Sequence, residues 1–270
     1  MPSSGSWGIG EIGDIAVMAK WARTAGIRFL QFLPIKETPR SKTSPYSALS
    51  AMAIDPQFIT MGVLEDFVAI GGERALEPGL RARLARVRAA PSIDYLGVRD
   101  LKHAVLRQAF ARFRETEWAR DTTRAVAFQA YMHSQAWWLD DYGLFRALHA
   151  RWDARPWHEW PSALRERQPT AVAQARLELA DDILYRQYLQ WVANEQWHAA
   201  RTASGDIALF GDLPFMVGAD SADVWARQDE FRLDASVGAP PDAFSDTGQD
   251  WNLPPYRWDV VAKRDFGWLR

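Results

Sequence analysis

The sequence has 270 residues, and its 32 Lys and Arg against 34 Asp and Glu give a formal net charge of −2. This balance argues against nucleic acid as a partner, and the absence of cysteine excludes disulfides, thiol nucleophiles and Cys-ligated metals. A hydrophobic content of 48% is enough for a large folded core. No segment is long and apolar enough to span a membrane, and we expect a cytoplasmic protein.

The first elements are a helix and a strand. Apolar residues at helical spacing predict a helix that Asp14 can cap and that Gly26 ends. Residues 27–35, IRFLQFLPI, form a dense apolar run that predicts a strand buried on both faces of a parallel sheet. Ligands meet such sheets beyond the carboxyl ends of the strands, so the loop over residues 36–46 is a candidate binding segment.

The middle of the chain has the pattern of helices. Apolar positions three and four residues apart predict helices over residues 100–118, 123–148 and 170–203. Prolines and tryptophans between residues 156 and 169 interrupt this pattern and predict an elbow. The middle of the chain is therefore interpreted as a large helical insertion.

The last part of the chain returns to a strand and loops. Residues 207–210 predict a second buried strand that leads into Gly211 and Asp212. Residues 220–258 lack periodicity and predict a long loop over a binding face. We therefore divide the chain into strands with a substrate loop (1–65), a helical insertion (66–203) and a strand with an active-site loop (204–270), without a separable second domain.

Several common functional motifs are absent or unsupported. Residues 8–13, GIGEIG, match the dinucleotide-binding pattern, but no strand can precede them, so we interpret these glycines as allowing a close backbone approach. The five histidines show no metal-ligand spacing, and no G-x-S-x-G elbow is present. We expect neither a metal nor a cofactor.

Carboxylates are the stronger candidates for function. Asp212 directly follows the second predicted strand, where a charged group is expected to meet a ligand rather than the core. Four further aspartates lie in the loop that follows, and turn or cap roles explain most of them better than chemistry does: Asp220, Asp223, Asp242 and Asp246.

Aromatic residues divide into two groups. Five lie in loop-like segments, where some of them can present a flat ring to a sugar: Tyr46, Trp225, Phe244, Trp251 and Tyr256. Those in predicted helices are expected to pack in the core: Trp21, Trp137, Trp138, Trp191 and Trp197.

Four blocks in order make the loop pattern specific. Residues 44–56 are SPYSALSAMAIDP, and residues 211–215 with 220–225 are GDLPF and DSADVW. Residues 240–245 and 248–251 are PPDAFS and GQDW, and residues 138–148 are WLDDYGLFRAL. Across almost the whole chain, these blocks resemble the amylomaltases, which are 4-alpha-glucanotransferases.

The resemblance implies a fold and an activity. It implies an α/β fold in which this chain is the N-terminal portion of a (β/α)8 TIM barrel, with a large helical insertion and an incomplete barrel. It also implies transfer of α-1,4-glucan segments between maltooligosaccharides, with retention of configuration through a double displacement. The implied partners are α-1,4-glucans and maltooligosaccharides.

The same resemblance suggests binding roles for five residues. Tyr46 is expected to stack on the glucose at the cleavage site, and Asp212 to bond its hydroxyls. Trp251 is expected to contact glucan chains, and Asp242 and Phe244 to shape the acceptor side. Asn252 stands where the family commonly has glycine, which bears on loop flexibility and on the preferred glucan length.

No catalytic residue is assigned. The family's nucleophile and acid/base carboxylates belong to an arginine-x-aspartate-histidine stretch and later segments, and the 270 residues contain no such stretch. We therefore expect the chain to be a fragment of a 4-alpha-glucanotransferase that is inactive alone. The alternative is a non-catalytic α-glucan-binding protein.

Overall fold

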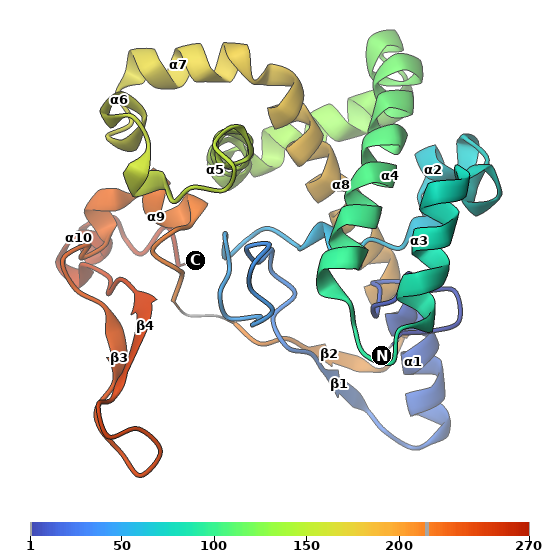
Figure 1. The fold of residues 1–270 in the computed structure, drawn as a ribbon, viewed down its shortest axis with the longest axis horizontal. Coiled ribbons are helices and arrows are strands. Elements are labelled where there is room, and N and C mark those ends of the chain that lie inside the picture. Colours follow the sequence, from blue (N-terminus) through green and yellow to red (C-terminus); the bar gives the residue numbers. More distant parts are fainter. Residues whose placement is uncertain (1, 214–215, 270) are drawn as a thin grey trace.

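A computed structural model describes residues 2–213 and 216–269 of the chain. Figure 1 shows a body of helices with a two-stranded sheet at one edge and a separate hairpin. The helices and strands are α1 (Asp14–Thr24), β1 (Phe29–Gln31), α2 (Glu65–Ala69), α3 (Pro78–Ala89), α4 (Tyr95–Thr116), α5 (Thr123–Arg151), α6 (Ser162–Arg165), α7 (Pro169–Glu178), α8 (Ala180–Ser204), β2 (Ala208–Phe210), α9 (Ala222–Ala226), β3 (Val237–Ala239), β4 (Gln249–Leu253) and α10 (Trp258–Lys263).

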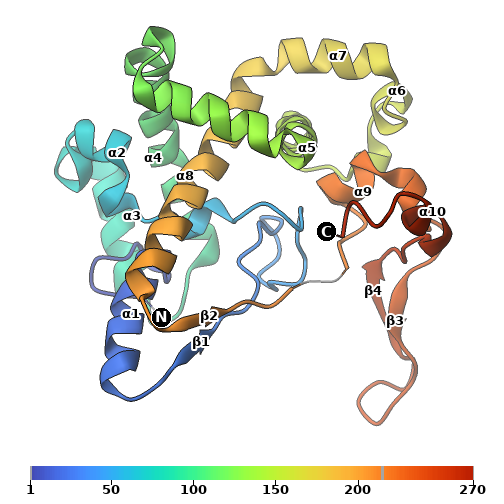
Figure 2. The same cartoon turned by 180° about the vertical axis from the view of Figure 1, so that it is seen from behind.

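The predicted helices are confirmed with two corrections. Helix α1 begins at Asp14, but its N-cap is Gly13 and no side chain caps it. Helices α4 and α5 cover the two segments predicted to be helical. The single helix expected over residues 170–203 is instead two helices, because Leu179 leaves helical geometry at φ −110° and ψ 17°. Helix α7 then runs across the direction of α8 (Figures 1 and 2), a change that continuous apolar spacing does not reveal.

The core between α4, α5 and α8 is rich in aromatic rings. Phe113 lies 5.0 Å from Tyr188 and 5.6 Å from Phe128 between ring centroids, and Phe128 lies 5.3 Å from Trp191. Such tilted and edge contacts add to the free energy gained by burying the rings.

The tryptophans in helices divide differently from the prediction. Trp138 and Trp191 are buried as predicted, and Trp197 is partly buried against the same core. Trp21 and Trp137 are about half exposed, so their predicted place in the core was wrong. On α1 it is Ala19 and Ala22 that pack inward, which leaves Trp21 on the opposite face.

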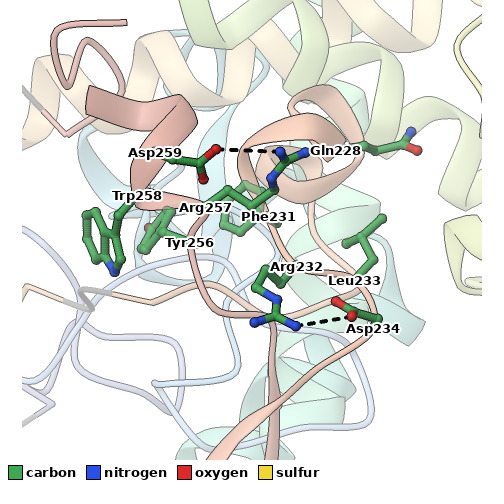
Figure 3. A pocket seen from close by; sticks show the side chains of 9 residues that line it. All are labelled: Gln228, Phe231, Arg232, Leu233, Asp234, Tyr256, Arg257, Trp258 and Asp259. Carbon is green, nitrogen blue, oxygen red and sulfur yellow. Dashed lines mark hydrogen bonds and ion pairs between the residues drawn. The ribbon is translucent and has the colours of Figure 1, made fainter. Parts of the chain in front are cut away.

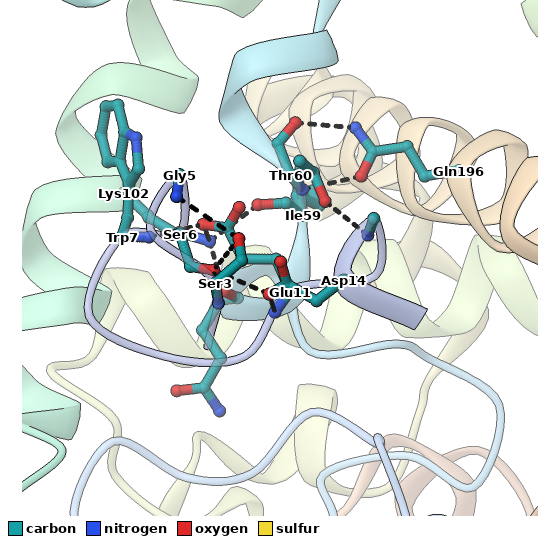
Figure 4. Close-up of polar contacts among 12 residues, drawn as sticks. Ser3, Gly5, Ser6, Trp7, Glu11, Asp14, Ile59, Thr60, Lys102 and Gln196 are labelled. Carbon is teal, nitrogen blue, oxygen red and sulfur yellow. Dashed lines mark hydrogen bonds and ion pairs between the residues drawn. The ribbon is translucent and has the colours of Figure 1, made fainter. Parts of the chain in front are cut away.

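Buried polar contacts fix the N-terminal segment to the helices (Figure 4). Lys102 on α4 lies 2.6 Å from Glu11, and its Nζ also donates to the carbonyls of Gln57 and Ile59. The side-chain amide of Gln196 on α8 bonds both the N–H and the C=O of Thr60. Glu11, Gln57 and Ile59 together use all three N–H donors of the Lys102 ammonium, as a buried ammonium requires.

The glycine-rich segment has the structural role predicted for it. Gly8 has φ +77°, and a Cβ there would come within 2.7 Å of the carbonyl oxygen of Val87. Only glycine allows this close approach of the two backbones. The interpretation of residues 8–13 as a packing feature is confirmed at this position.

Strands β1 and β2 pair in parallel, with Leu30 opposite Leu209. The prediction of a parallel sheet is confirmed, but burial on both faces was wrong. Leu30 and Leu209 pack toward the helices, whereas Phe29 and Phe210 are 62% and 60% exposed. Among the described residues the sheet has two strands of three residues each, and helices cover only one face.

Residues 220–258 are more regular than predicted. They contain α9 and an antiparallel hairpin of β3 and β4, which projects away from the helical body (Figures 1 and 2). Trp225 on α9 is fully buried and Tyr256 is 6% exposed, so these two are not among the loop rings that can face a ligand. A helix of five residues is too short to show periodicity in the sequence.

Candidate functional site

The loops that follow β1 and β2 meet at the carboxyl ends of these strands. The hydroxyl of Tyr46 donates a hydrogen bond to Oδ2 of Asp212 at 3.0 Å, joining positions 166 residues apart. The Tyr46 side chain is half exposed, and Asp212 is partly exposed. The hydrogen bond to the Asp212 carboxylate raises the pKa of Tyr46, because it stabilises the protonated phenol. Two residues that the sequence selected separately thus form one polar pair.

A buried carboxylate holds the base of the Tyr46 loop. Tyr142 on α5 donates to Oε2 of Glu37 at 2.6 Å, and Arg146 on the same helix donates to Oε1 at 3.0 Å. The backbone of Glu37 also bonds Leu49 and Ala53 across the loop. Burial alone would raise the pKa of Glu37, but the positive charges nearby outweigh it and lower the pKa. The carboxylate is therefore ionised and fixes the loop to α5.

Asp223 on α9 holds the far end of the same loop. Its Oδ2 accepts a hydrogen bond from the backbone N–H of Ala51 at 2.7 Å, and its Oδ1 lies 3.5 Å from the hydroxyl of Ser50. Burial raises the pKa of Asp223 to about 6. Asp223 therefore has a structural role, but it anchors a distant loop instead of forming the turn or cap that the sequence favoured.

Two of the remaining loop aspartates, Asp220 and Asp242, also have turn or anchoring contacts. Asp220 lies 3.1 Å from Nε2 of His149 and accepts from the backbone N–H of Trp157 at 3.1 Å. Asp242 accepts from the N–H groups of Phe244 and Ser245, so its carboxylate closes a turn at the hairpin tip. This turn is the structural role that the sequence analysis weighed against a role of Asp242 in glucan binding.

The hairpin carries the two exposed aromatic rings. Phe244 is 96% exposed at the tip and Trp251 on β4 is 47% exposed. No hydrogen bond or ion pair in residues 2–213 and 216–269 joins their side chains to Tyr46 or Asp212. The backbone N–H of Ala219 does donate to the carbonyl of Asn252 at 3.1 Å, which ties the base of the hairpin to the loop after β2.

Asn252 keeps the backbone conformation that glycine favours. Its φ is +53°, in the left-handed region that asparagine tolerates better than most residues. The departure from the family pattern at this position therefore leaves the local turn possible.

Sequence reasoning missed Glu37, although the rule that selected Asp212 would have found it. Both are charged residues that follow an apolar strand. Pro214 and Phe215 of the second block lie outside the described residues, so their contribution to the site is not described.

An open hollow lies beside the hairpin base and α10 (Figure 3). It has a volume of about 670 Å³. Tyr256 packs against Phe231 at 4.9 Å between ring centroids, while the Trp258 ring is 57% exposed. None of the five residues predicted to bind glucan lines this hollow.

Neither a metal-binding cluster nor a membrane-spanning helix is found among the described residues. Within residues 2–213 and 216–269, no group of three or more His, Asp or Glu residues could hold a metal ion. None of the helices in that part of the chain is long and apolar enough to cross a membrane.

Comparison with known proteins gives the family. The family model described as 4-alpha-glucanotransferase matches residues 1–270. The chain is 34% identical to the 4-alpha-glucanotransferase of Thermus thermophilus, covering 98% of this chain and 52% of the relative. It is 35% identical to that of Synechocystis, covering 97% and 52%.

Solved structures agree with the sequence comparison. The amylomaltase from Streptococcus agalactiae in complex with acarbose is similar over 98% of this chain and 53% of that chain, with a TM-score of 0.83 at 27% identity. The amylomaltase from Corynebacterium glutamicum matches 98% of this chain and 36% of that chain, with a TM-score of 0.77 at 25% identity. The chain spans about half the length of the curated relatives named here. The resemblance seen in the loop blocks is confirmed, and the chain belongs to the 4-alpha-glucanotransferase family.

Proposed function

We propose that this chain supplies glucan-binding loops of a 4-alpha-glucanotransferase, which moves α-1,4-glucan segments between maltooligosaccharides. The observation that carries the proposal is the Tyr46–Asp212 pair, an exposed ring and a carboxylate at the carboxyl ends of adjacent parallel strands. In α/β folds this is the edge where substrates bind. Membership of the family supports the choice of substrate and reaction.

The two residues of the pair have complementary tasks. The exposed face of the Tyr46 ring offers a flat apolar surface for a pyranose. A carboxylate has two oxygens with several lone pairs, so Asp212 can accept from Tyr46 and from sugar hydroxyls together. The hydrogen bond between them sets the angle between ring and carboxylate before the sugar arrives, which reduces the ordering cost of binding.

The hairpin is proposed to form the acceptor side. Phe244 and Trp251 present rings to solvent, and Asp242 shapes the turn that carries Phe244. Rings that exclude water from a glycosyl-enzyme intermediate favour transfer to a sugar hydroxyl over hydrolysis. The Asp242 carboxylate acts here through the turn rather than through direct contact with the sugar.

The reaction itself needs two further carboxyl groups. In a retaining double displacement, one carboxylate attacks the anomeric carbon and the leaving oxygen takes a proton from a carboxylic acid. The acceptor hydroxyl then displaces the enzyme and returns its proton to the same acid/base group. Neither role is assigned to the five residues proposed to bind glucan.

The exposed face of β1 and β2 is consistent with a barrel. Phe29 and Phe210 present apolar rings on the face that helices do not cover. In a (β/α)8 barrel, that face points to the interior and packs against the other strands. We infer that these two strands belong to such a barrel, with α2–α8 as an insertion between them in the sequence. The three-part division of the chain and a cytoplasmic location stay predictions.

Maltotriose disproportionation by the full-length protein tests the function. A 4-alpha-glucanotransferase releases glucose and makes longer maltooligosaccharides. Asp212→Asn is expected to lower kcat/KM roughly tenfold or more, because the substrate loses a charge-assisted hydrogen bond. Tyr46→Phe, which keeps the ring and removes the hydroxyl, is expected to lower it less.

A matched control lies at the other end of β2. Asp206→Asn removes an exposed carboxylate that pairs with Arg23, and its effect on transfer should be negligible. Equal losses in both aspartate variants would contradict the assigned role of Asp212. Glucan-dependent quenching of tryptophan fluorescence without any new oligosaccharide would instead indicate the non-catalytic glucan-binding alternative.

A further inference from the structure

A second cavity lies apart from the proposed glucan-binding residues. It has a volume of about 480 Å³, within the range of small-molecule sites. Residues 37–57 form one wall, and α4, α5 and α8 form the others. None of the five residues proposed to bind glucan lines this cavity.

Most charged groups that line the cavity are already paired. Arg146 pairs with Glu37 at 3.0 Å and Arg99 with Asp55 at 3.3 Å. Lys102 pairs with Glu11 at 2.6 Å, and Arg40 pairs with Asp100 at 2.7 Å. The exposed carboxylate of Asp153 also lines the cavity and forms no ion pair within the described residues. Of the buried charged residues in the lining, all but one are paired.

Arg186 is the exception. Its side chain lines the cavity, only 7% of the residue is exposed, and it forms no ion pair or hydrogen bond with any described residue. Its buried Nε has no acceptor. A guanidinium stays charged in proteins, so an unpaired one is costly to bury unless an anion compensates it.

Two neighbours of Arg186 line the same cavity. The Tyr185 side chain also lines the cavity, is fully buried, and its hydroxyl has no partner in the described part of the chain. His103 lies 5.9 Å from Tyr185 between ring centroids. Desolvation, followed by the positive charges of Arg186 and Arg107, lowers the pKa of His103 to about 4. The cavity thus holds a guanidinium with no ion pair, a hydroxyl with no hydrogen-bond partner and a histidine whose pKa is lowered mainly by burial.

We infer that this cavity binds a small oxyanion, the phosphate or carboxylate group of a small molecule, through the guanidinium of Arg186 and the hydroxyl of Tyr185. The planar fork of a guanidinium matches both groups with two parallel hydrogen bonds. The carboxylates of Glu37 and Asp55, which also line the cavity, are engaged with their own arginines and limit the anion to a small one.

Binding of defined anions to the full-length protein tests the inference. Calorimetric titrations with inorganic phosphate, methyl phosphate and acetate, in a buffer free of other oxyanions, distinguish free phosphate, a phosphate monoester and a carboxylate. At least one probe should bind at millimolar concentration or below, and Arg186→Met should weaken that binding roughly tenfold or more. Tyr185→Phe should weaken it less, and the bound anion should raise the pKa of His103 measured by NMR.

Arg114→Met provides the matched control. Arg114 pairs with Asp181 at 2.6 Å between α4 and α8 and does not line the cavity, so this variant should bind the probe as the unaltered protein does. The inference is overturned if no probe binds at millimolar concentration, or if Arg186→Met binds as tightly as the Arg114 variant. Should Arg186→Met fail to fold, an unchanged affinity in Tyr185→Phe together with an unchanged pKa of His103 would overturn it.

Discussion

The helical body and the loops at the strand ends use the same residue types in opposite ways. In the body, Phe128 and Trp191 are buried, and the carboxylate of Asp66 is fully enclosed by its donors. In the loops, Tyr46 and Phe244 present their rings to solvent, and their carboxylate neighbours Asp212 and Asp242 are partly exposed and exposed, respectively. We therefore expect stability to depend on the helices and the proposed substrate contact to depend on the loops, so substitutions in the two regions should have separable effects.

The largest expected effect is the loss of Asp66. Its carboxylate, on α2, accepts hydrogen bonds from Arg112, Arg124 and Tyr188 at 2.7 to 3.0 Å. Burial alone would raise the pKa of Asp66, but these hydrogen bonds outweigh it and lower the pKa. Asp66→Ala should reduce the free energy of unfolding by about 3–5 kcal/mol, because two arginines and a buried hydroxyl lose their shared acceptor. Urea denaturation of the full-length protein measures this change in the free energy of unfolding.

An exposed pair gives the control for this prediction. Asp181 pairs with Arg114 at 2.6 Å between α8 and α4, but its side chain is 78% exposed. Asp181→Ala should change the free energy of unfolding by less than about 1 kcal/mol. Similar losses in Asp66→Ala and Asp181→Ala would show that the enclosed network is not what stabilises the helical body.

The next effect concerns the boundary between the two regions and depends on pH. The pKa of Asp223 is about 6 in the folded chain, against 3.8 for an ordinary aspartate. Between these values the folded state binds more protons than the unfolded state, so the free energy of unfolding falls as pH rises. The difference corresponds to about 3 kcal/mol, present below pH 3.8 and lost as pH rises through 6. Asp223→Asn keeps an acceptor for Ala51 and should remove this part of the fall, measured by urea denaturation at several pH values.

Two other carboxylates sharpen the pH measurement. Asp55 also has a pKa raised to about 6, first by burial and then by the charge of Glu37, so Asp223→Asn should remove only part of the slope. Asp206, exposed beside Arg23, has a lowered pKa and contributes with the opposite sign. The variant Asp206→Asn should therefore keep the fall between pH 4 and 6 that Asp223→Asn reduces. A slope unchanged in Asp223→Asn would contradict the buried, anchoring role of this residue.

Helices could be predicted from the sequence because their signal is local. The spacing of Leu101, Val105 and Ala109 reports one buried face of α4 without reference to the rest of the chain. Burial of a strand depends on which other elements cover its two faces. The apolar sequence around Phe29 does not specify those elements. The turn at Leu179 escaped prediction because apolar spacing continues on both sides of it.

The site could be predicted residue by residue but not as an arrangement. A charge after an apolar strand identified Asp212, and the loop block identified Tyr46. The two residues are 166 positions apart, and their contact depends on the pairing of β1 with β2. Trp225 was misplaced because five helical residues give too little pattern to reveal a buried face. The unpaired guanidinium of Arg186 is visible only once the partners of its neighbours are known.

The smallest effect on stability should come from the hairpin tip. Phe244→Ala removes a ring that is 96% exposed, so the free energy of unfolding should change by no more than about 0.5 kcal/mol. If that ring contacts glucan, the KM for maltooligosaccharides should rise several-fold, because the sugar loses apolar contact area. Leu177→Ala on α7 is the control. Leu177 is exposed too, at 77%, but it lies away from the proposed acceptor side. A stability loss in Phe244→Ala like that of Asp66→Ala, or an unchanged KM, would remove the distinction between a stabilising body and substrate-binding loops.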